Sequence, residues 1–189
     1  MKPDWEDRDR VVLSNGHICP VLYATMAHAG YFPVEELQTL RKFGARLQGH
    51  PHREYLPMLE NSSGPLGAGL SQAVGMALAD RMDGKDKERF IYCLMSDGEL
   101  DEGQNWEAIM FAAHKNVDNL IATIDWNGQQ IDGPTKKVMG LDSLRAKFEA
   151  FNWQVLEMEG NDMDAVVAGL NNAKTFVGKG KPIVILMKT

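Results

Sequence analysis

From about residue 88 to the end of the chain, short apolar runs alternate with amphipathic stretches in which apolar residues recur every three or four positions. The short runs predict strands at Phe90–Met95, Leu120–Ile124, Trp153–Met158 and Pro182–Lys188. The amphipathic stretches predict helices at Trp106–His114, Leu144–Phe151 and Met163–Phe176. Such repetition predicts an α/β fold of three layers, in which a mainly parallel central sheet carries helices on both faces. The unbroken apolar run Ile183–Leu186 predicts a central strand covered on both sides.

The first 85 residues follow a different pattern, with helical and loop segments and no predicted strand. Pro33 precedes a helical face made by Val34, Leu37, Leu40 and Phe43. The stretch 50–65 is rich in Pro, His, Asn, Ser and Gly, which predicts a loop, and a helical pattern follows Gly69. We therefore expect one domain over residues 1–189, with a helix and loop region at 1–85 and strand–helix repeats at 86–189.

Composition excludes several functional classes. The formal net charge of -6 disfavours binding to nucleic acid or to an anionic membrane, because both need a contiguous basic surface. Cys19 and Cys93 lie far apart and form neither a redox pair nor a zinc cluster. No run approaches the roughly 20 apolar residues of a membrane span, and the segment Met1–Trp5 lacks the apolar core of a signal peptide. These features predict a soluble protein of the cytoplasm with reduced thiols.

Polar residues follow two of the predicted strands at the point where each strand ends. Asp97 and Gly98 follow the first strand after Ser96, and Asn127 and Gly128 follow the second. Since a crossover helix joins these strands, their carboxyl ends meet at the crevice where open α/β sheets bind ligands. Asp-Gly also ends strands in ordinary turns, and the sequence of this pair alone does not separate the two uses.

A carboxylate, an amide oxygen and a backbone carbonyl are hard oxygen ligands that suit Mg²⁺, which usually keeps positions for water and phosphate oxygens. The glycines beside Asp97 and Asn127 let the backbone approach such a ligand closely. A helix beginning near Gly103 adds the positive end of its dipole. The segment therefore favours a Mg²⁺-bound diphosphate.

Ser96-Asp97-Gly98, with Asn127 standing 30 residues after Asp97, resembles the Gly-Asp-Gly…Asn fingerprint of thiamine diphosphate enzymes. Other motifs, in order along nearly the whole chain, resemble the N-terminal, diphosphate-binding domain or subunit of transketolase, shortened at both ends. They are Arg8-Asp9-Arg10, Leu13-Ser14-Asn15-Gly16-His17, Gly49-His50-Pro51, Gly64-Pro65-Leu66-Gly67, Glu102-Gly103, Asn127-Gly128 and Ile131-Asp132-Gly133. The resemblance implies thiamine diphosphate and Mg²⁺ as cofactors and the transfer of a two-carbon ketol unit between sugar phosphates.

The resemblance also implies roles for the residues at the strand ends. Asp97, Asn127 and the carbonyl of Gln129 would hold the metal ion. Gly98 and Glu99 would lie against the diphosphate.

Further roles implied by the resemblance fall on three other segments. His17 and His50 would face the thiazolium and the sugar, where the family uses histidines for proton transfer or for contacts. Gly64 and Leu66 would line the cofactor cleft. Glu102 matches a carboxylate near the dimer interface that is linked to the acid activating the aminopyrimidine.

The chain departs from the family at Ser96, which replaces the first glycine of the fingerprint, and at Trp126, which replaces a small or polar residue. Trp126 either packs over the cofactor or fills the edge of the crevice. The family begins earlier, with a Ser-Gly-His-Pro-Gly motif, and continues into a pyrimidine-binding domain that supplies the activating glutamate. We therefore expect a split or truncated enzyme whose site a separate chain completes, and whose uncovered apolar surface drives homo- or hetero-oligomer formation.

Two other functions fit the same residues. One is another member of the superfamily, such as a 1-deoxyxylulose-5-phosphate synthase or a phosphoketolase. The other is a non-catalytic remnant that dimerises or binds a diphosphate weakly. Binding of thiamine diphosphate that depends on the metal and is weakened by Asp97→Ala is expected of the catalytic half, whereas the remnant need not bind the cofactor at all.

Overall fold

The computed structural model describes residues 5–189, so most of the segment that bears on the signal-peptide prediction, residues 1–4, lies outside the described residues. Five strands form the main sheet in the order β1-β2-β3-β7-β6, and every neighbouring pair is parallel. The strands of this sheet are β1 Arg10–Leu13, β2 Ile91–Ser96, β3 Leu120–Trp126, β6 Gln154–Glu159 and β7 Ile183–Lys188. A separate antiparallel hairpin consists of β4 Gln129–Gln130 and β5 Gly133–Pro134.

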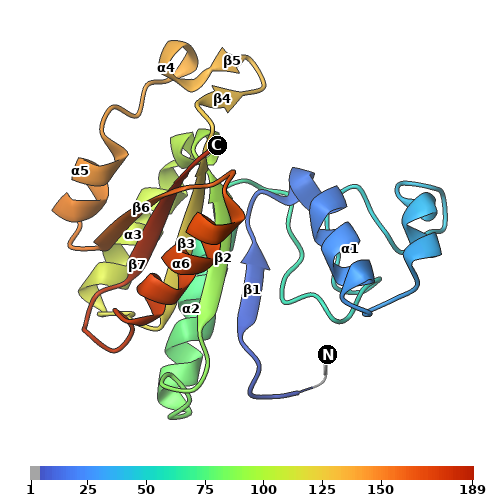
Figure 1. Cartoon of the computed structure of the whole chain (residues 1–189), viewed down its shortest axis with the longest axis horizontal. Coiled ribbons are helices and arrows are strands. Elements are labelled where there is room, and N and C mark those ends of the chain that lie inside the picture. Colours follow the sequence, from blue (N-terminus) through green and yellow to red (C-terminus); the bar gives the residue numbers. More distant parts are fainter. Residues whose placement is uncertain (1–4) are drawn as a thin grey trace.

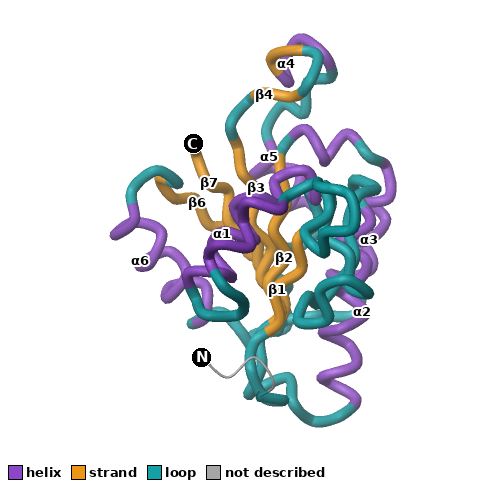
Figure 2. The backbone as a smooth tube through the Cα atoms, turned by 90° about the vertical axis from the view of Figure 1, so that its right-hand side faces the viewer, coloured by secondary structure: helices purple, strands orange, loops and turns teal. Residues whose placement is uncertain are grey.

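Helices cover both faces of the sheet, so the predicted three-layer α/β fold is confirmed. Figure 2 shows the strands between α6 on one side and α2 and α3 on the other. The α-helices are α1 Cys19–His28, α2 Ala68–Met82, α3 Gly103–His114, α4 Thr135–Val138, α5 Leu144–Ala150 and α6 Met163–Lys174. The 3-10 helices are η1 Gly16–Ile18, η2 Val34–Thr39 and η3 Gly98–Asp101. None of the helices within residues 5–189 combines the length and the apolar character needed to cross a bilayer.

The two faces of the sheet build two cores. On β2, the alternate residues Ile91, Cys93 and Met95 are buried against α2 and α3. On the other face, Ile183 and Ile185 of β7 pack with α6. The residues of the run 183–186 are all fully buried, and β7 pairs with β3 on one side and β6 on the other. The prediction of a strand covered on both sides is therefore confirmed.

A third cluster lies beyond the edge strand β1, around α1 (Figure 1). Sequence analysis predicted neither β1 nor α1. The predicted helical face after Pro33 is confirmed at Val34 and Leu37 and wrong beyond them: η2 ends at Thr39, Leu40 leaves the helical conformation with a ψ of 126°, and the side chain of Phe43 is fully exposed. The reason is local, because Arg41 and Gly44 adopt positive φ angles of 61° and 76°, which a continuing helix does not allow. The predicted loop at 50–65 is confirmed.

Candidate functional site

The ends of β2 and β3 bring Asp97 and the Asn127–Gly128 turn together. Ser96 pairs with Asp125 in the parallel ladder, and the Asp97 N–H donates to the carbonyl of Asp125 at 3.0 Å. The Gly128 N–H donates to Asp97 Oδ2 at 2.8 Å. The two strand ends that carry the candidate ligands therefore converge on the same side of the sheet, as the parallel arrangement requires.

The Asp97 carboxylate is buried, with 1% of the residue exposed, and both oxygens accept backbone N–H groups. Burial raises the pKa of this carboxyl above its ordinary value, and the neighbouring Asp125 charge acts in the same direction, whereas the N–H donors of Gly128 and Gly98 lower it. A cation beside the carboxylate would offset the cost of burying the charge. The electrostatics of Asp97 therefore fit a metal ligand.

The amide of Asn127 is oriented by its own turn. Its Nδ2 donates to Asp125 Oδ2 at 2.9 Å, and its Oδ1 accepts the Gln129 N–H at 2.8 Å. Asn127 is exposed, and an amide oxygen has a second lone pair for another partner. The Gln129 carbonyl faces Gly98, since a Cβ added to that glycine would lie 3.7 Å from the carbonyl oxygen. A carboxylate, an amide oxygen and a backbone carbonyl thus belong to the segments at the two strand ends.

Within residues 5–189, no group of three or more His, Cys, Asp or Glu side chains is arranged to hold a metal ion. A cation bound by Asp97 would therefore need amide, carbonyl, water and phosphate oxygens to complete its shell, which is the usual situation of Mg²⁺ at phosphate sites. The donor set fits Mg²⁺ with a diphosphate better than it fits a cation held by protein alone.

A hollow of about 340 Å³ borders Asp97 on the side of the β4–β5 excursion. Trp126, Gly128 and Lys136 line it. Trp126 is half-buried, packs against the main core, and has Lys188 Nζ 5.7 Å from its ring centroid. The indole therefore forms a wall of the hollow and is also part of the packing.

Glu99 points into the protein. Only 1% of this residue is exposed, and its Oε1 accepts Ser14 Oγ at 2.5 Å and the Gly67 N–H at 2.7 Å. Burial raises the pKa of the Glu99 carboxyl, and these two hydrogen bonds act against that rise. The carboxylate therefore already binds Ser14 and the backbone of Gly67 inside the protein. A contact between Glu99 and a diphosphate stays a prediction.

The segments of His17, His50 and Gly64 lie together. Gly16 lies so close to the neighbouring loop that an added Cβ would stand 2.8 Å from Ser63 Oγ and 3.0 Å from the Gly64 nitrogen. A Cβ on Gly64 would stand 3.8 Å from the His50 ring. Both histidines are exposed. Two imidazoles are therefore available at one loop cluster.

Glu102 precedes α3 and lies against the Leu66–Gly67 turn. Gln104 Nε2 donates to the Leu66 carbonyl at 2.6 Å, which ties this turn to the start of α3. Gly67 has a φ of +79°, and a Cβ there would stand 2.8 Å from the Glu102 Cβ. Glu102 is exposed. Its carboxylate is therefore accessible beside the turn that carries the candidate cleft residue Leu66.

Comparison with known proteins decides the family. Residues 1–189 match the family model described as "Transketolase, thiamine diphosphate binding domain". The chain belongs to the transketolase family. Thiamine diphosphate is thus the cofactor of the domain family to which the chain belongs.

Relatives of this transketolase domain include subunits of split enzymes. The 6-deoxy-6-sulfo-D-fructose transketolase subunit SqwG of Clostridium sp. (strain MSTE9) is 45% identical over 99% of this chain and 66% of that protein. An apulose-4-phosphate transketolase subunit of Phocaeicola vulgatus is 45% identical over 88% of this chain and 58% of that protein. The chain therefore spans less than two thirds of these curated relatives.

The fold also matches solved transketolases. The transketolase of Leishmania mexicana superposes with a TM-score of 0.90 at 35% identity, covering 99% of this chain and 29% of that one. The transketolase of Campylobacter jejuni gives a TM-score of 0.90 at 34% identity over the whole of this chain and 30% of that one. The parallel sheet and its helices are thus those of the transketolase fold.

Sequence reasoning missed Ser14, which stands within one of the motifs but received no role of its own. Ser14 follows β1, is fully buried, and contacts both Glu99 and the start of α2. A polar residue directly after an apolar run and before Asn-Gly was the available signal. Its partner Glu99 stands 85 residues further along the chain, so the contact itself carries no local signature.

Replacing Gly67 with alanine should lower the free energy of unfolding of this domain by about 1–3 kcal/mol, because φ is positive and the new Cβ meets Glu102. Gly75→Ala is the matched control. Gly75 lies inside α2 with no neighbour within 4 Å of the added Cβ, so the substitution should raise stability by about 0.5–1 kcal/mol. Urea denaturation measures both, and equal shifts of the same sign would contradict the described turn.

Proposed function

We propose that this chain binds Mg²⁺ and the diphosphate of thiamine diphosphate at the ends of β2 and β3. We further propose that it acts in the transfer of a two-carbon ketol unit between sugar phosphates. The observation that carries the proposal is the hydrogen bond from the Gly128 N–H to the buried Asp97 Oδ2, which joins the turn that follows Asn127 to the end of β2. Membership of the thiamine diphosphate-binding domain family supports the same cofactor.

In this proposal, Asp97, Asn127 and the carbonyl of Gln129 hold the metal ion. Gly98 lies against the diphosphate through its backbone, and it must lack a side chain because an added Cβ would stand 3.0 Å from the Gln130 Cβ. The bound cofactor supplies the electron sink for cleavage of the ketose, and the protein supplies orientation and electrostatics. A bound cation would offset the cost of burying the charge of Asp97, and Asp97 would in this way help to hold the diphosphate at the strand ends.

The remaining candidate residues act on the substrate side of the cleft. Gly64 and Leu66 form its wall, on a turn that Gln104 holds against α3. His17 and His50 are exposed at one loop cluster, where their imidazoles would bind sugar hydroxyls or transfer protons. Each of these two histidines can serve either purpose in ketol transfer.

We propose that a second chain with a pyrimidine-binding domain completes the enzyme. The relatives named as subunits support this arrangement, and they are longer than this chain. Glu102, exposed at the start of α3, is the carboxylate that would meet the partner's activating acid. In this proposal the partner supplies the acid that activates the aminopyrimidine, so activity depends on assembly.

Assembly through apolar surface is also proposed. Met110 and Phe111 on α3 are 57% and 44% exposed, and Val21 on α1 is 58% exposed. Exposed apolar side chains in such numbers favour a homo- or hetero-oligomer. Sedimentation at high concentration tests this, and a clean monomer both alone and with the partner would contradict it.

The cytoplasm is the proposed location of the enzyme. Cys19 and Cys93 are buried and form no disulfide, which is consistent with a reducing compartment.

The substrate is proposed as a sugar phosphate. Two relatives at 45% identity are named for 6-deoxy-6-sulfo-D-fructose and for apulose-4-phosphate, so substrate differs between such relatives. A panel of phosphorylated and sulfonated ketose donors therefore belongs in the assay.

The chain alone should show no measurable ketol transfer, whereas the chain mixed with a pyrimidine-binding transketolase chain, thiamine diphosphate and Mg²⁺ should transfer ketol units from a ketose phosphate donor. A coupled assay of the aldose product measures this. The same mixture with Asp97→Ala should be inactive, because the diphosphate loses its metal. Full activity of the isolated chain would refute the need for a partner. Inactivity of a cofactor-loaded mixture with every donor would refute ketol transfer.

A further inference from the structure

Glu99 makes contacts that no cofactor-binding role explains. It belongs to η3 and follows the Asp97-Gly98 pair, yet its side chain is buried between β1 and the start of α2. Its Oε1 accepts Ser14 Oγ at 2.5 Å and the Gly67 N–H at 2.7 Å. Asn105, also fully buried, donates through Nδ2 to the Glu99 carbonyl at 2.7 Å and so holds the backbone. Hydrogen bonds therefore hold both the side chain and the backbone carbonyl of Glu99.

Ser14 extends the contact to a third segment. Its N–H donates to the Leu94 carbonyl at 2.9 Å, which continues the β1–β2 ladder by one residue. Its Oγ accepts the Gly69 N–H at 3.2 Å while donating to Glu99. Gly69 has no room for a side chain here, because an added Cβ would stand 2.5 Å from the Ser14 Cβ. The side chain of Ser14 therefore occupies the space that a side chain at position 69 would need.

The N–H groups of Gly67 and Gly69 belong to the start of α2, where the first backbone donors of a helix have no partner within the helix. Gly67 is the N-cap residue and has no side chain to supply a cap. Glu99 and Ser14 take this role from distant positions in the sequence. A carboxylate at this end of a helix also interacts favourably with the helix dipole.

The three segments joined at this point are those that carry the candidate site. Ser14 is followed by the turn of His17, Gly67 follows Leu66, and Glu99 follows Asp97 and Gly98. We propose that Glu99 is a positioning residue, which fixes these three segments relative to one another through Ser14 and Gly67. This inference rests on the proposed function, since the segments matter only if they bind the cofactor.

The test measures binding of thiamine diphosphate at saturating Mg²⁺ by calorimetry. Glu99→Ala should weaken binding about tenfold or more, because the acceptor that Ser14 and the Gly67 N–H share is lost and the segments are no longer linked. Glu99→Gln keeps an acceptor of the same length and should stay within about twofold of the wild type. Ser14→Ala should weaken binding less than Glu99→Ala, and the double variant should be no weaker than Glu99→Ala alone. Glu88→Ala, at an exposed position outside the site, is the control.

Amide hydrogen exchange of Gly67 and Gly69 gives a readout that does not depend on the cofactor. Glu99→Ala should speed exchange at Gly67, and Glu99→Gln should restore protection. Unchanged exchange at Gly67, or cofactor affinity of Glu99→Ala within about twofold of the wild type, would overturn the inference. If Glu99→Ala does not fold, amide exchange at Gly69 is measured in Ser14→Ala instead. Faster exchange than in the wild type supports the link through Ser14, and unchanged exchange contradicts it. A third outcome separates this inference from the proposed function. If the wild-type chain binds no cofactor, the proposed function is refuted. Faster exchange at Gly67 in Glu99→Ala would then still show that Glu99 links the segments.

Discussion

Asp97→Ala should weaken Mg²⁺-dependent binding of thiamine diphosphate at least about a hundredfold, which corresponds to about 2.7 kcal/mol. Asp97 is the acidic member of the proposed ligand set, and its carboxylate is already buried at the strand ends. Its removal leaves amide and carbonyl oxygens that do not neutralise a divalent cation. Calorimetric titration of the cofactor, with and without Mg²⁺, measures the loss.

Asp83→Ala is the matched control, because Asp83 is exposed and caps the opposite end of α2 from the site. This substitution changes the net charge by the same amount and should leave the affinity unchanged within about twofold. Circular dichroism confirms that both variants fold. An Asp97→Ala variant that keeps the same Mg²⁺ dependence as the wild type would remove this residue from the metal site.

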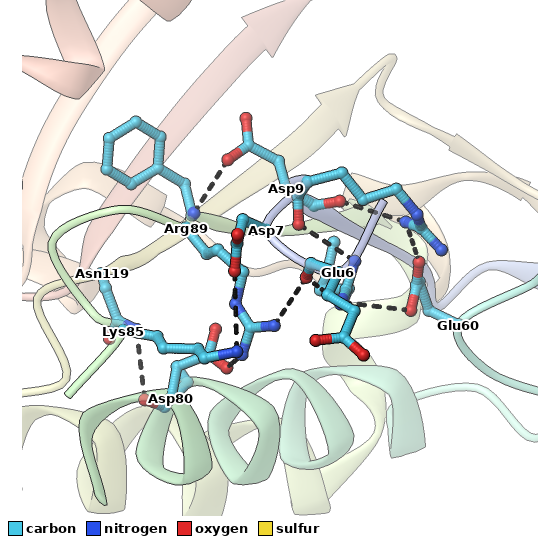
Figure 3. A network of polar contacts seen from close by, with 12 residues as sticks. Glu6, Asp7, Asp9, Glu60, Asp80, Lys85, Arg89 and Asn119 are labelled. Atoms are coloured by element: carbon cyan, nitrogen blue, oxygen red, sulfur yellow. Dashed lines mark hydrogen bonds and ion pairs between the residues drawn. The ribbon is translucent and has the colours of Figure 1, made fainter. Parts of the chain in front are cut away.

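The second large effect is on stability. Asp80→Ala should lower the free energy of unfolding by about 3–5 kcal/mol, because it leaves the Arg89 guanidinium buried without its anion. Asp80 and Arg89 are 5% and 8% exposed, and their side chains form an ion pair between α2 and the segment preceding β2 (Figure 3). Arg89 Nη1 also donates to the Glu6 carbonyl at 2.8 Å, which ties the N-terminal segment to this pair.

Urea denaturation measures this loss, again with Asp83→Ala as the control. Asp83 lies three residues from Asp80 but is exposed, so its substitution should change stability by no more than about 0.5 kcal/mol. Replacing the pair together, as Asp80→Ala with Arg89→Met, should recover most of the loss because no unpaired charge stays buried. A loss below about 1 kcal/mol for Asp80→Ala would show that the guanidinium finds water or another acceptor.

The strand–helix repeats after residue 88 were predictable because their apolar runs are long and well separated. The strand β1 was not, because it has only four residues, stands beside charged Arg8 and Asp9, and pairs with a strand some 80 positions away. The helix α1 was obscured for a different reason. It packs against η2 and against apolar residues of the 47–59 segment, and not mainly against the sheet, so its pattern did not match a sheet-covering helix.

The candidate site was predictable where its geometry follows from the sheet. Asp97 and Asn127 stand at equivalent ends of neighbouring parallel strands, so their convergence needs only the strand prediction. The direction of the Glu99 side chain was not predictable, because its partners Ser14 and Gly67 lie 85 and 32 residues away. Buried polar contacts between distant segments depend on tertiary packing, which no local pattern encodes.

The most direct test of the metal assignment is a crystal structure of the chain with thiamine diphosphate and Mn²⁺ in place of Mg²⁺, with the ion located by anomalous scattering. We expect one ion within roughly 2.0–2.3 Å of an Asp97 carboxylate oxygen, Asn127 Oδ1 and the Gln129 carbonyl, with diphosphate oxygens completing its shell. An ion bound elsewhere, or a diphosphate held away from the ends of β2 and β3, would contradict the account.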